Sequence, residues 1–275
     1  MKRDNPLFFL ILILILGSCK TTNVSKIKPD PNFHLYLLVG QSNMAGRGRI
    51  DSLSIPNNPR ILMLTDKNQW AVAQDPLHFD KPKVIGVGPG LAFGQKMLTL
   101  KKDKNIKIGL IPCAVGGTSI DMWQPGKDAY DGQYYPYDDA IKRIQIAMKY
   151  GVIKGIVWHQ GEADSKKAKA KVYIEKLQNL ITLFRNEIGN PRVLFIAGEL
   201  GYYRERYMLI NHELKKLPYM VPFSAVATAE GLIHKGDGTH FDSKSARELG
   251  ERMALKMHEL QITTEVTNNS EVTGH

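Results

Sequence analysis

Residues 35–49 read LYLLVGQSNMAGRGR, an apolar run that stops at Gly40 and continues with Gln41, Ser42 and Asn43. A continuous apolar run of this length is typical of a strand buried on both faces of a parallel sheet. The simplest interpretation of the polar residues after Gly40 is a tight turn, in which glycine supplies unusual backbone angles and Ser or Asn caps a helix. The alternative is that the turn exposes the Ser42 hydroxyl as a nucleophile, much as the G-x-S-x-G turn does in another fold.

Further apolar runs alternate with longer amphipathic stretches along the chain. We expect strands at 33–40, 60–64, 106–111, 152–158 and 192–197, and helices over Tyr173–Ile188, over Ala246–Leu260, and from a cap at Asp138 or Asp139 through Met148 to a stop at Gly151. This alternation predicts one α/β domain over residues 33–260, a three-layer α/β/α sandwich with a parallel, flavodoxin-like sheet. Ligands bind beyond the carboxyl ends of the strands in such sheets, which is where Ser42 falls.

Composition narrows the class of protein. The chain has 275 residues, of which 43% are hydrophobic, enough for one sizeable core. Its formal net charge is +10, but the Lys and Arg residues are scattered, without aromatic interleaving and without zinc or helix-turn-helix spacing. We therefore expect no nucleic-acid partner, while an acidic glycan stays an open alternative because positive charge attracts anionic ligands.

The N-terminus, MKRDNPLFFLILILILGSCK, has the charged, apolar and small order of a secretory signal. Its apolar run is short for a membrane span. The segment Leu16–Cys19 also resembles the bacterial lipobox, whose cysteine is lipidated after cleavage. We expect a lipoprotein-type signal peptide over residues 1–18, lipidation of Cys19, and secretion across the inner membrane. The lipid would be the only membrane contact, in the periplasm or at the outer membrane.

Polar, aperiodic segments flank the domain at both ends. Residues 19–32 suit a tether, and residues 261–275 are expected to form a disordered tail. Cys113 is the only other cysteine, so no intramolecular disulfide is expected in the mature chain. Its surroundings favour a small buried hydrophobe.

Two blocks at expected strand ends supply candidate hydrogen-bond donors. Residues 113–123, CAVGGTSIDMW, place Gly116 and Gly117 after a strand, where paired glycines allow close backbone approach to a ligand or form an ordinary turn. Residues 155–164, GIVWHQGEAD, put Gln160 at a strand end, where its neutral amide could donate to a developing oxyanion. The His-x-x-Glu spacing of this block does not favour a metal, because no second His or Cys stands at ligand spacing.

The last block, residues 234–250, reads HKGDGTHFDSKSARELG and holds Asp237 and His240 three residues apart in a Gly-rich loop before a helix. A carboxylate beside a histidine fixes the imidazole tautomer and leaves the other nitrogen free to accept a hydroxyl proton. Capping of the helix by Asp242, with a chance histidine upstream, is the alternative. A nucleophile, oxyanion donors and an Asp-His pair that converge on one sheet edge meet the requirements of acyl transfer.

The blocks GQSNMAGRG, GGTSI, HQGEAD and GDGTHFDSKSARELG closely resemble those of the sialate O-acetylesterase-like and acetylxylan esterase group, carbohydrate esterase family six, within the SGNH hydrolase superfamily. The resemblance runs in order over roughly residues 33–260. It implies the SGNH hydrolase fold, with Ser42 as nucleophile, His240 as base and Asp237 as the orienting acid. It also implies that the reaction needs no metal or cofactor.

The same resemblance implies further site residues. An oxyanion hole would combine the Ser42 amide, the amide of Gly116 or Gly117, and the Gln160 side chain. Glu162 matches a family acid with a supporting catalytic role, so the identity of the orienting acid stays open.

We therefore predict a serine esterase that removes O-acetyl groups from a carbohydrate of the acetylxylan or sialate type through an acetyl-Ser42 intermediate. Gln41 and Asn43 are candidate substrate-binding residues. Trp123 is a candidate for stacking on a sugar face, with core packing as the alternative. Two other functions stay open: a non-catalytic glycan-binding lipoprotein on the same fold, and a carbohydrate O-acyltransferase. The sequence names neither the glycan nor the oligomeric state.

One glycine-rich stretch imitates a dinucleotide-binding loop. Residues 84–94, VIGVGPGLAFG, lack the required context, because Pro89 removes an amide and no acidic residue stands about 20 residues further on. We expect this stretch to begin a helix, packed through Leu91, Phe93, Met97 and Leu98.

Overall fold

The computed structural model describes residues 28–56 and 58–272. Within them one sheet has the strand order β3-β2-β4-β1-β5-β6-β7. The strands are β1 (Phe33–Gly40), β2 (Ile61–Leu64), β3 (Trp70–Val72), β4 (Lys107–Pro112), β5 (Val152–His159), β6 (Leu194–Gly198) and β7 (Ser224–Ala227). All five strands expected from the apolar runs are therefore present.

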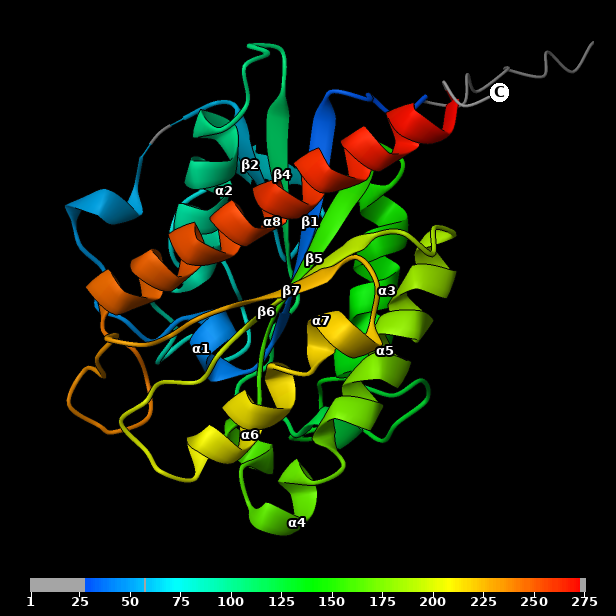
Figure 1. Cartoon of the computed structure of the whole chain (residues 1–275). Coiled ribbons are helices and arrows are strands. Elements are labelled where there is room, and N and C mark those ends of the chain that lie inside the picture. Colours follow the sequence, from blue (N-terminus) through cyan, green and yellow to red (C-terminus); the bar gives the residue numbers. More distant parts are fainter. Residues whose placement is uncertain (1–27, 57, 273–275) are drawn as a thin grey trace, which may run out of the picture.

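Helices cover both faces of the sheet (Figure 1). They are α1 (Ser42–Ala45), α2 (Pro89–Thr99), α3 (Pro136–Ala147), α4 (Lys167–Ala170), α5 (Tyr173–Ile188), α6 (Tyr207–Leu214), α7 (Leu217–Met220) and α8 (Ser243–Val272), with 3-10 turns η1 (Ser52–Ser54), η2 (Ile120–Met122) and η3 (Glu162–Asp164). Helices α2 and α8 pack together on one face, and α3 and α5 lie on the other. The predicted three-layer α/β/α sandwich is confirmed.

The sheet is parallel except for its edge strand β3, which runs antiparallel to β2. The order β4-β1-β5-β6-β7 is the flavodoxin-like order 2-1-3-4-5, with β2 and β3 added beyond β4. From β1 the chain passes to β2 and the edge strand β3, returns to β4 beside β1, and then continues on the other side of β1 with β5. Ligands bind at this kind of switch point, beyond the carboxyl ends of β1 and β5.

Strand β1 lies in the middle of the sheet and is buried on both faces. Leu35, Leu37 and Val39 belong to the core between the sheet and α3 and α5. Tyr36 and Leu38 belong to the opposite core, beneath α2 and α8. Two cores on one strand explain why its sequence is continuously apolar rather than alternating.

The glycine-rich stretch 84–94 begins a helix, as predicted. Pro89 occupies the first turn of α2, where its missing amide costs no hydrogen bond. Leu91, Phe93, Met97 and Leu98 are all buried. Helix α5 ends at Gly189, whose φ of 71° gives the left-handed C-cap that glycine favours.

Helix α3 differs from its predicted bounds. It begins at Pro136 and ends at Ala147, so neither Asp138 nor Asp139 is its cap and Gly151 lies beyond its end. Proline fits the first helical position, and the two carboxylates lie in the first turn, where the helix dipole favours negative charge. The short strands β3 and β7 were not predicted, because WAV and SAVA lack the run of large aliphatic residues that marks the four-residue strand β2.

The prediction of a disordered tail over residues 261–275 is wrong for most of its length, because α8 continues to Val272. Gln261 is 9% exposed, and its Nε2 donates to Tyr36 Oη over 3.1 Å. The predicted tether over 19–32 is also too long at its end. The Asp30 amide donates to Tyr150 O and the Asn32 carbonyl accepts from the Lys107 amide, so both residues already belong to the domain.

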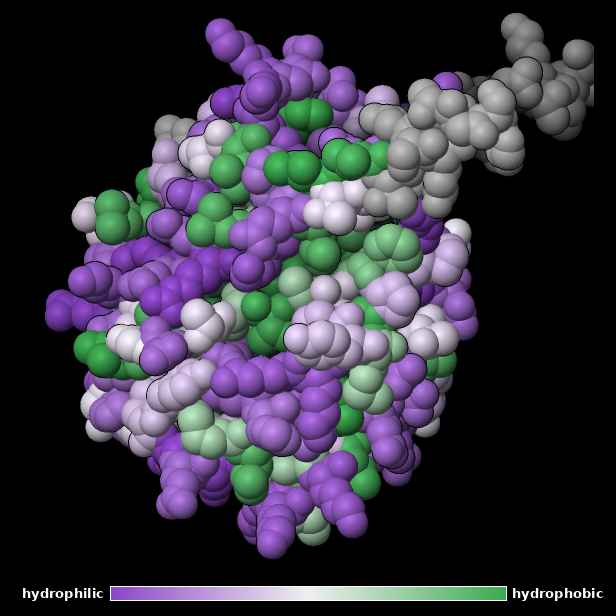
Figure 2. All heavy atoms as spheres, viewed as in Figure 1, coloured by the Kyte–Doolittle hydropathy of each residue, from purple (hydrophilic) through white to green (hydrophobic). Residues whose placement is uncertain are grey.

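The predicted signal peptide, Cys19 and most of the tether lie outside the described residues. No helix within 28–56 and 58–272 is long and apolar enough to cross a membrane. On the face drawn in Figure 2, hydrophilic residues predominate and hydrophobic ones form small scattered groups.

Candidate active site

Ser42, His240 and Asp237 form one hydrogen-bonded chain at the carboxyl edge of the sheet. His240 Nε2 lies 3.0 Å from Ser42 Oγ, and His240 Nδ1 lies 2.8 Å from Asp237 Oδ2. A proton on Nδ1, held by the carboxylate, leaves Nε2 free to accept the serine proton. Ser42 is 7% exposed and the His240 side chain is 23% exposed. The arrangement can therefore generate a nucleophile at a nearly enclosed hydroxyl.

Gly40 explains why β1 stops where it does. Its φ is 132°, and a Cβ at this position would lie 2.0 Å from the carbonyl oxygen of His159 on β5. The Gln41 amide donates to that same carbonyl over 2.9 Å, so the chain turns against β5. Gln41, not Ser42, is the N-cap of α1, and no side chain caps this helix. A turn therefore follows Gly40, as predicted. The Ser42 hydroxyl does not cap the helix and is available to hydrogen-bond His240.

The loop that carries His240 is held by Asp237. Its Oδ1 accepts from the amides of Thr239 and His240 over 2.9 and 2.8 Å, and Lys235 Nζ lies 3.8 Å from Oδ2. Partial burial opposes ionisation of this carboxyl, but the hydrogen bonds from His240 and Thr239 outweigh it and hold the pKa of Asp237 well below its usual range. Asp237 is therefore a carboxylate beside the imidazole.

Backbone amides near Ser42 supply candidate oxyanion donors. Ser42 is the first residue of α1, so its amide has no acceptor within that helix. The Gly116 amide donates to Asp80 Oδ2 over 2.7 Å and is occupied. The Gly117 amide has no hydrogen-bond acceptor within the described part of the chain. Of the two predicted glycines, only Gly117 keeps its amide free.

Sequence analysis missed a buried ion pair behind Gly116. Arg47 Nη2 lies 2.7 Å from Asp80 Oδ2, with side-chain exposures of 5% and 1%. A Cβ on Gly116 would lie 2.8 Å from Asp80 Oδ2 and 3.3 Å from Ser42 Cβ, so the pair is close to the nucleophile. Arg47 stands in the first sequence block and could have been singled out there. Asp80 stands in no recognisable pattern, and only the fold reveals it.

The predicted oxyanion role of Gln160 is not supported by its placement. Gln160 is fully buried, and its Nε2 donates to Gln41 Oε1, the Thr118 carbonyl and Asp164 Oδ2 over 3.1, 3.0 and 2.7 Å. An amide nitrogen has two protons, so these three acceptors leave none for a substrate oxygen. The Gln160 side chain instead connects the end of β5 to three neighbouring segments inside the protein.

Glu162 reaches the catalytic loop only through Asn43. Asn43 Nδ2 donates to Glu162 Oε1 over 2.6 Å and to the Thr239 carbonyl over 3.1 Å, and Asn43 Oδ1 accepts from the Phe241 amide over 3.0 Å. Asn43 is thus a brace on both sides of His240, not a substrate ligand. Asp237 is the carboxylate that contacts the imidazole, and Glu162 is not.

His159 and Glu162 do not form an ion pair. His159 is fully buried, and its Nε2 lies 3.0 Å from the Glu199 carbonyl, to which it donates. Burial lowers the pKa of His159 and keeps the ring neutral. Its Nδ1, 3.9 Å from Glu162 Oε1, then carries no proton to donate.

Gln41 and Trp123, predicted to bind substrate, are both internal. Gln41 is 4% exposed, and its Oε1 accepts from Gln160 and from the Ala163 amide. Trp123 is fully buried, with its ring centroid 5.3 Å from that of Trp158 in an edge-on contact. Core packing, the alternative for this tryptophan, is confirmed, and it cannot stack on a sugar.

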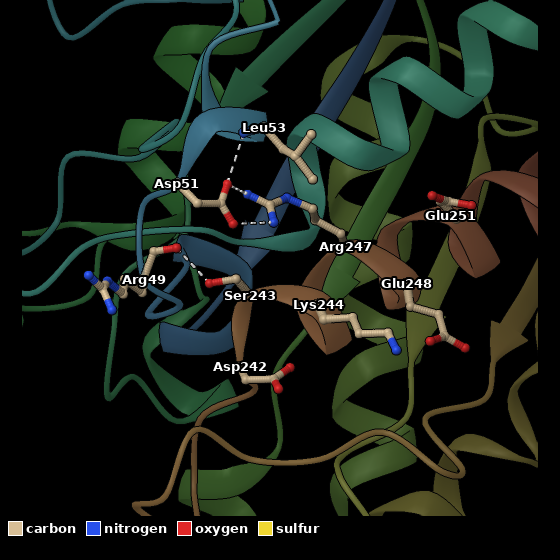
Figure 3. Close-up of a pocket in the computed structure, with 9 residues that line it drawn as sticks. All are labelled: Arg49, Asp51, Leu53, Asp242, Ser243, Lys244, Arg247, Glu248 and Glu251. Atoms are coloured by element: carbon tan, nitrogen blue, oxygen red, sulfur yellow. Dashed lines mark hydrogen bonds and ion pairs between the residues drawn. The ribbon is translucent and has the colours of Figure 1, made fainter.

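A polar cleft lies beside the catalytic loop, at the start of α8 (Figure 3). Arg247 makes a two-pronged contact with Asp51 over 2.6 and 2.8 Å. Asp242 Oδ1 accepts from the Ser245 amide over 2.7 Å and caps α8. The capping part of the alternative interpretation is therefore correct, but the histidine upstream is not there by chance, because His240 Nε2 lies 3.0 Å from Ser42 Oγ.

No group of three or more His, Cys, Asp or Glu side chains within residues 28–56 and 58–272 could hold a metal ion. Cys113 is partly buried against the core, and burial raises the pKa of its thiol to about 11. At neutral pH it is a protonated, weakly reactive thiol.

Residues 32–259 match a protein family described as carbohydrate esterase, sialic acid-specific acetylesterase. The chain belongs to this family. It is a carboxylic ester hydrolase of the carbohydrate acetylesterase class. A probable carbohydrate esterase of Arabidopsis thaliana is 32% identical over 249 residues, which cover 82% of this chain and 90% of that protein.

Solved structures show the same architecture. The crystal structure of an Arabidopsis thaliana protein superposes with a TM-score of 0.73 at 29% identity, covering 84% of this chain and 99% of that one. The structure of NanS superposes with a TM-score of 0.65 at 16% identity, covering 86% and 99%. The likeness to NanS shows the α/β/α fold alone.

Proposed function

We propose that the protein removes O-acetyl groups from a carbohydrate through an acetyl-Ser42 intermediate. The observation that carries this proposal is the hydrogen-bonded chain from Ser42 Oγ through His240 to Asp237. His240 Nε2 takes the hydroxyl proton as Ser42 Oγ attacks the ester carbonyl, and returns it to the sugar oxygen that leaves. The same imidazole then deprotonates a water that attacks the acetyl-serine and releases acetate.

Two backbone amides would stabilise the negative charge of the tetrahedral intermediate by donating hydrogen bonds to its oxygen. The amide of Ser42 begins a helix, and that of Gly117 is free. A Cβ on Gly117 would lie 2.4 Å from Tyr130 Oη, and its φ is 90°, so only glycine fits this position. Fixed amides of this kind stabilise an oxyanion without reorganisation during the reaction.

The two alternative functions are less well supported. A glycan-binding protein without activity needs neither a base at 3.0 Å from a serine hydroxyl nor a carboxylate that holds the base. A carbohydrate O-acyltransferase would share the acetyl-serine and differ only in the acceptor. Acetate release in water separates the three, because only a hydrolase produces free acetate without an added sugar acceptor.

The test is acetate release from an acetylated xylan and from an O-acetylated sialic acid, the two substrate classes that the family resemblance implies. We expect hydrolysis of at least one of them and of a small aryl acetate by the wild-type protein. Ser42→Ala removes one hydroxyl from a turn and should leave the fold intact while abolishing hydrolysis. Near-normal turnover by purified Ser42→Ala would contradict the serine mechanism.

A further inference from the structure

A second cavity, of about 300 Å³, opens beside Ser42 over the carboxyl end of β4. We call it the β4 cavity, and its floor is the segment 112–115. The Val115 amide donates to the Gly40 carbonyl over 3.0 Å, so this floor runs directly beside the end of β1. Gly116, whose Cα backs Ser42, is the next residue. The cavity and the nucleophile are therefore neighbours on one sheet edge.

Three buried polar atoms in residues that line this cavity have no hydrogen-bond partner in the described part of the chain: Asp80 Oδ1, His78 Nε2 and Arg143 Nε. Asp80 is 4% exposed and His78 is 2% exposed. The other carboxylate oxygen of Asp80 is already occupied by Arg47 and the Gly116 amide. Buried polar groups without a partner are uncommon in native proteins, and a bound ligand is one explanation for them.

The chemistry of these three atoms, which include acceptors and a donor, favours a neutral ligand with hydroxyl groups. A carboxylate oxygen only accepts hydrogen bonds and repels a second anion. Burial lowers the pKa of His78 to about 4, so its ring is neutral and does not attract an anion either. Hydroxyl groups both donate and accept, and so suit the Asp80 carboxylate and the His78 imidazole together.

The cations that line the β4 cavity are partly occupied within the described residues. The Nη atoms of Arg143 donate to the carbonyls of Leu64 and Thr65, and Lys142 lies 3.3 Å from Asp139. Arg143 Nε keeps one proton without an acceptor, which the oxygen of a hydroxyl group can accept.

The remaining walls include aromatic rings. Phe79 lies under the Arg143 guanidinium at 5.6 Å, and Tyr134 Oη donates to the Asp80 carbonyl. Apolar and aromatic walls with a few converging polar groups are typical of small-molecule sites, and the volume lies at the lower end of their range of about 300–1,000 Å³. The β4 cavity has room for a single ring.

We propose that the β4 cavity binds a neutral sugar ring next to the ring whose acetyl ester reaches Ser42. The inference rests on the proposed function and narrows its substrate to an acetylated disaccharide or longer glycan. Asp80 Oδ1 accepts from one hydroxyl of the neighbouring ring, and His78 Nε2 bonds a second.

The test compares matched substrates: mono-O-acetyl methyl glycosides and the corresponding mono-O-acetyl disaccharides of xylose, glucose and galactose. We expect kcat/KM to be about 10-fold or more higher for at least one disaccharide, since two added hydrogen bonds of ordinary strength suffice. His78→Phe keeps an aromatic ring and removes both ring nitrogens, including the unpartnered Nε2. It should reduce the disaccharide advantage about 5-fold, the effect of one lost hydrogen bond, chiefly through KM.

The matched control is His34→Phe. His34 Nδ1 is also buried without a partner among the described residues, but His34 is the second residue of β1, at the opposite edge of the sheet from Ser42. This variant should keep the disaccharide advantage. Disaccharides that react no faster than the monosaccharides, or an advantage that His78→Phe leaves unchanged, would overturn the proposal.

Binding measurements separate failure of this proposal from failure of the proposed function. Calorimetry on Ser42→Ala with the deacetylated disaccharides and monosaccharides needs no catalysis. We expect tighter binding of a disaccharide, and weaker binding once His78→Phe is added. Aryl acetate hydrolysis by the wild-type protein tests the esterase separately. If the wild-type protein is inactive but binds a disaccharide preferentially, the esterase function is refuted and the subsite is retained. If the wild-type protein is active but shows no such preference, the subsite is refuted and the esterase function is retained.

Discussion

Asn43, the residue after the nucleophile Ser42, donates from Nδ2 to Glu162 Oε1 over 2.6 Å. The same amide group holds the backbone on both sides of His240, at Thr239 and Phe241. Glu162 therefore affects the imidazole only indirectly: it holds Asn43, and Asn43 holds the loop that carries His240. Asp237 contacts the imidazole directly.

The two acids should consequently differ in their effect on catalysis. Asp237→Asn should lower kcat by up to about 10⁴-fold, as the corresponding change does in serine proteases, because it favours the wrong tautomer. Glu162→Gln keeps an acceptor for Asn43 and should cost far less. Both variants and the double variant are assayed on one acetyl ester, where losses that multiply indicate separate roles. A larger loss at Glu162 than at Asp237 would contradict this assignment of the acid.

The pH dependence should reflect the ionised state of Asp237. Its lowered pKa means that the carboxylate stays ionised at every pH above about 4, the ordinary value for this group. Above about pH 4, Asp237 should therefore contribute no ionisation step to the pH profile of kcat/KM. The lowered pKa also adds folding stability that is present above about pH 4 and lost as the pH falls further towards the folded pKa. An ionisation step above this pH that disappears in Asp237→Asn would show that the acid titrates in this range.

Gln160 should matter for stability rather than for the oxyanion. Gln160→Met keeps the volume but removes the donor that serves Thr118 and Asp164. We expect the free energy of unfolding to fall by about 1–3 kcal/mol, the cost of leaving a buried acceptor unpaired. Denaturant titration measures this loss, and kcat of the folded variant should stay within about 10-fold of wild type. A fall of about 10²-fold or more with unchanged stability is the pattern of a lost oxyanion donor and would restore that role.

Trp123 should contribute to folding and not to glycan binding. Trp123→Ala empties a fully buried site against Trp158 and should lower the free energy of unfolding by about 3–5 kcal/mol. Trp123→Phe keeps part of the packing and tests substrate binding in a folded protein. Its KM for an acetylated disaccharide should equal that of wild type, and a several-fold increase would mean that the ring contacts the sugar after all.

Membrane attachment is expected from the proposal that Cys19 is lipidated. Cys19→Ser should release the protein from the membrane fraction, because one lipidated residue replaces the cleaved apolar run as the anchor. Intact-mass measurement of the wild-type protein should show a lipid on Cys19 as the first residue. An unmodified N-terminus at another position would refute the assignment. Cys113→Ser is the matched control and should leave attachment unchanged.

Local sequence determined most of the fold and the reactive group. A continuous apolar run predicts a doubly buried strand wherever it occurs, so the central strands could be located without knowledge of their neighbours. Asp237 and His240 are three residues apart on one loop, and their contact is also local. The glycine at the end of β1 signalled a turn, and the order of strands and helices placed that turn at the ligand-binding edge.

Tertiary structure decided which polar groups face the substrate. Gly116 and Gly117 are equivalent by sequence, but a carboxylate 36 residues earlier occupies only the first. Gln160 is directed into the protein because its three acceptors come from separate segments of the chain. The last helix continues past residue 260, where Gln261 donates to Tyr36, 225 residues before it. A buried donor or acceptor takes the partner that the fold brings within about 3 Å, and the distance along the chain places no limit on where that partner comes from.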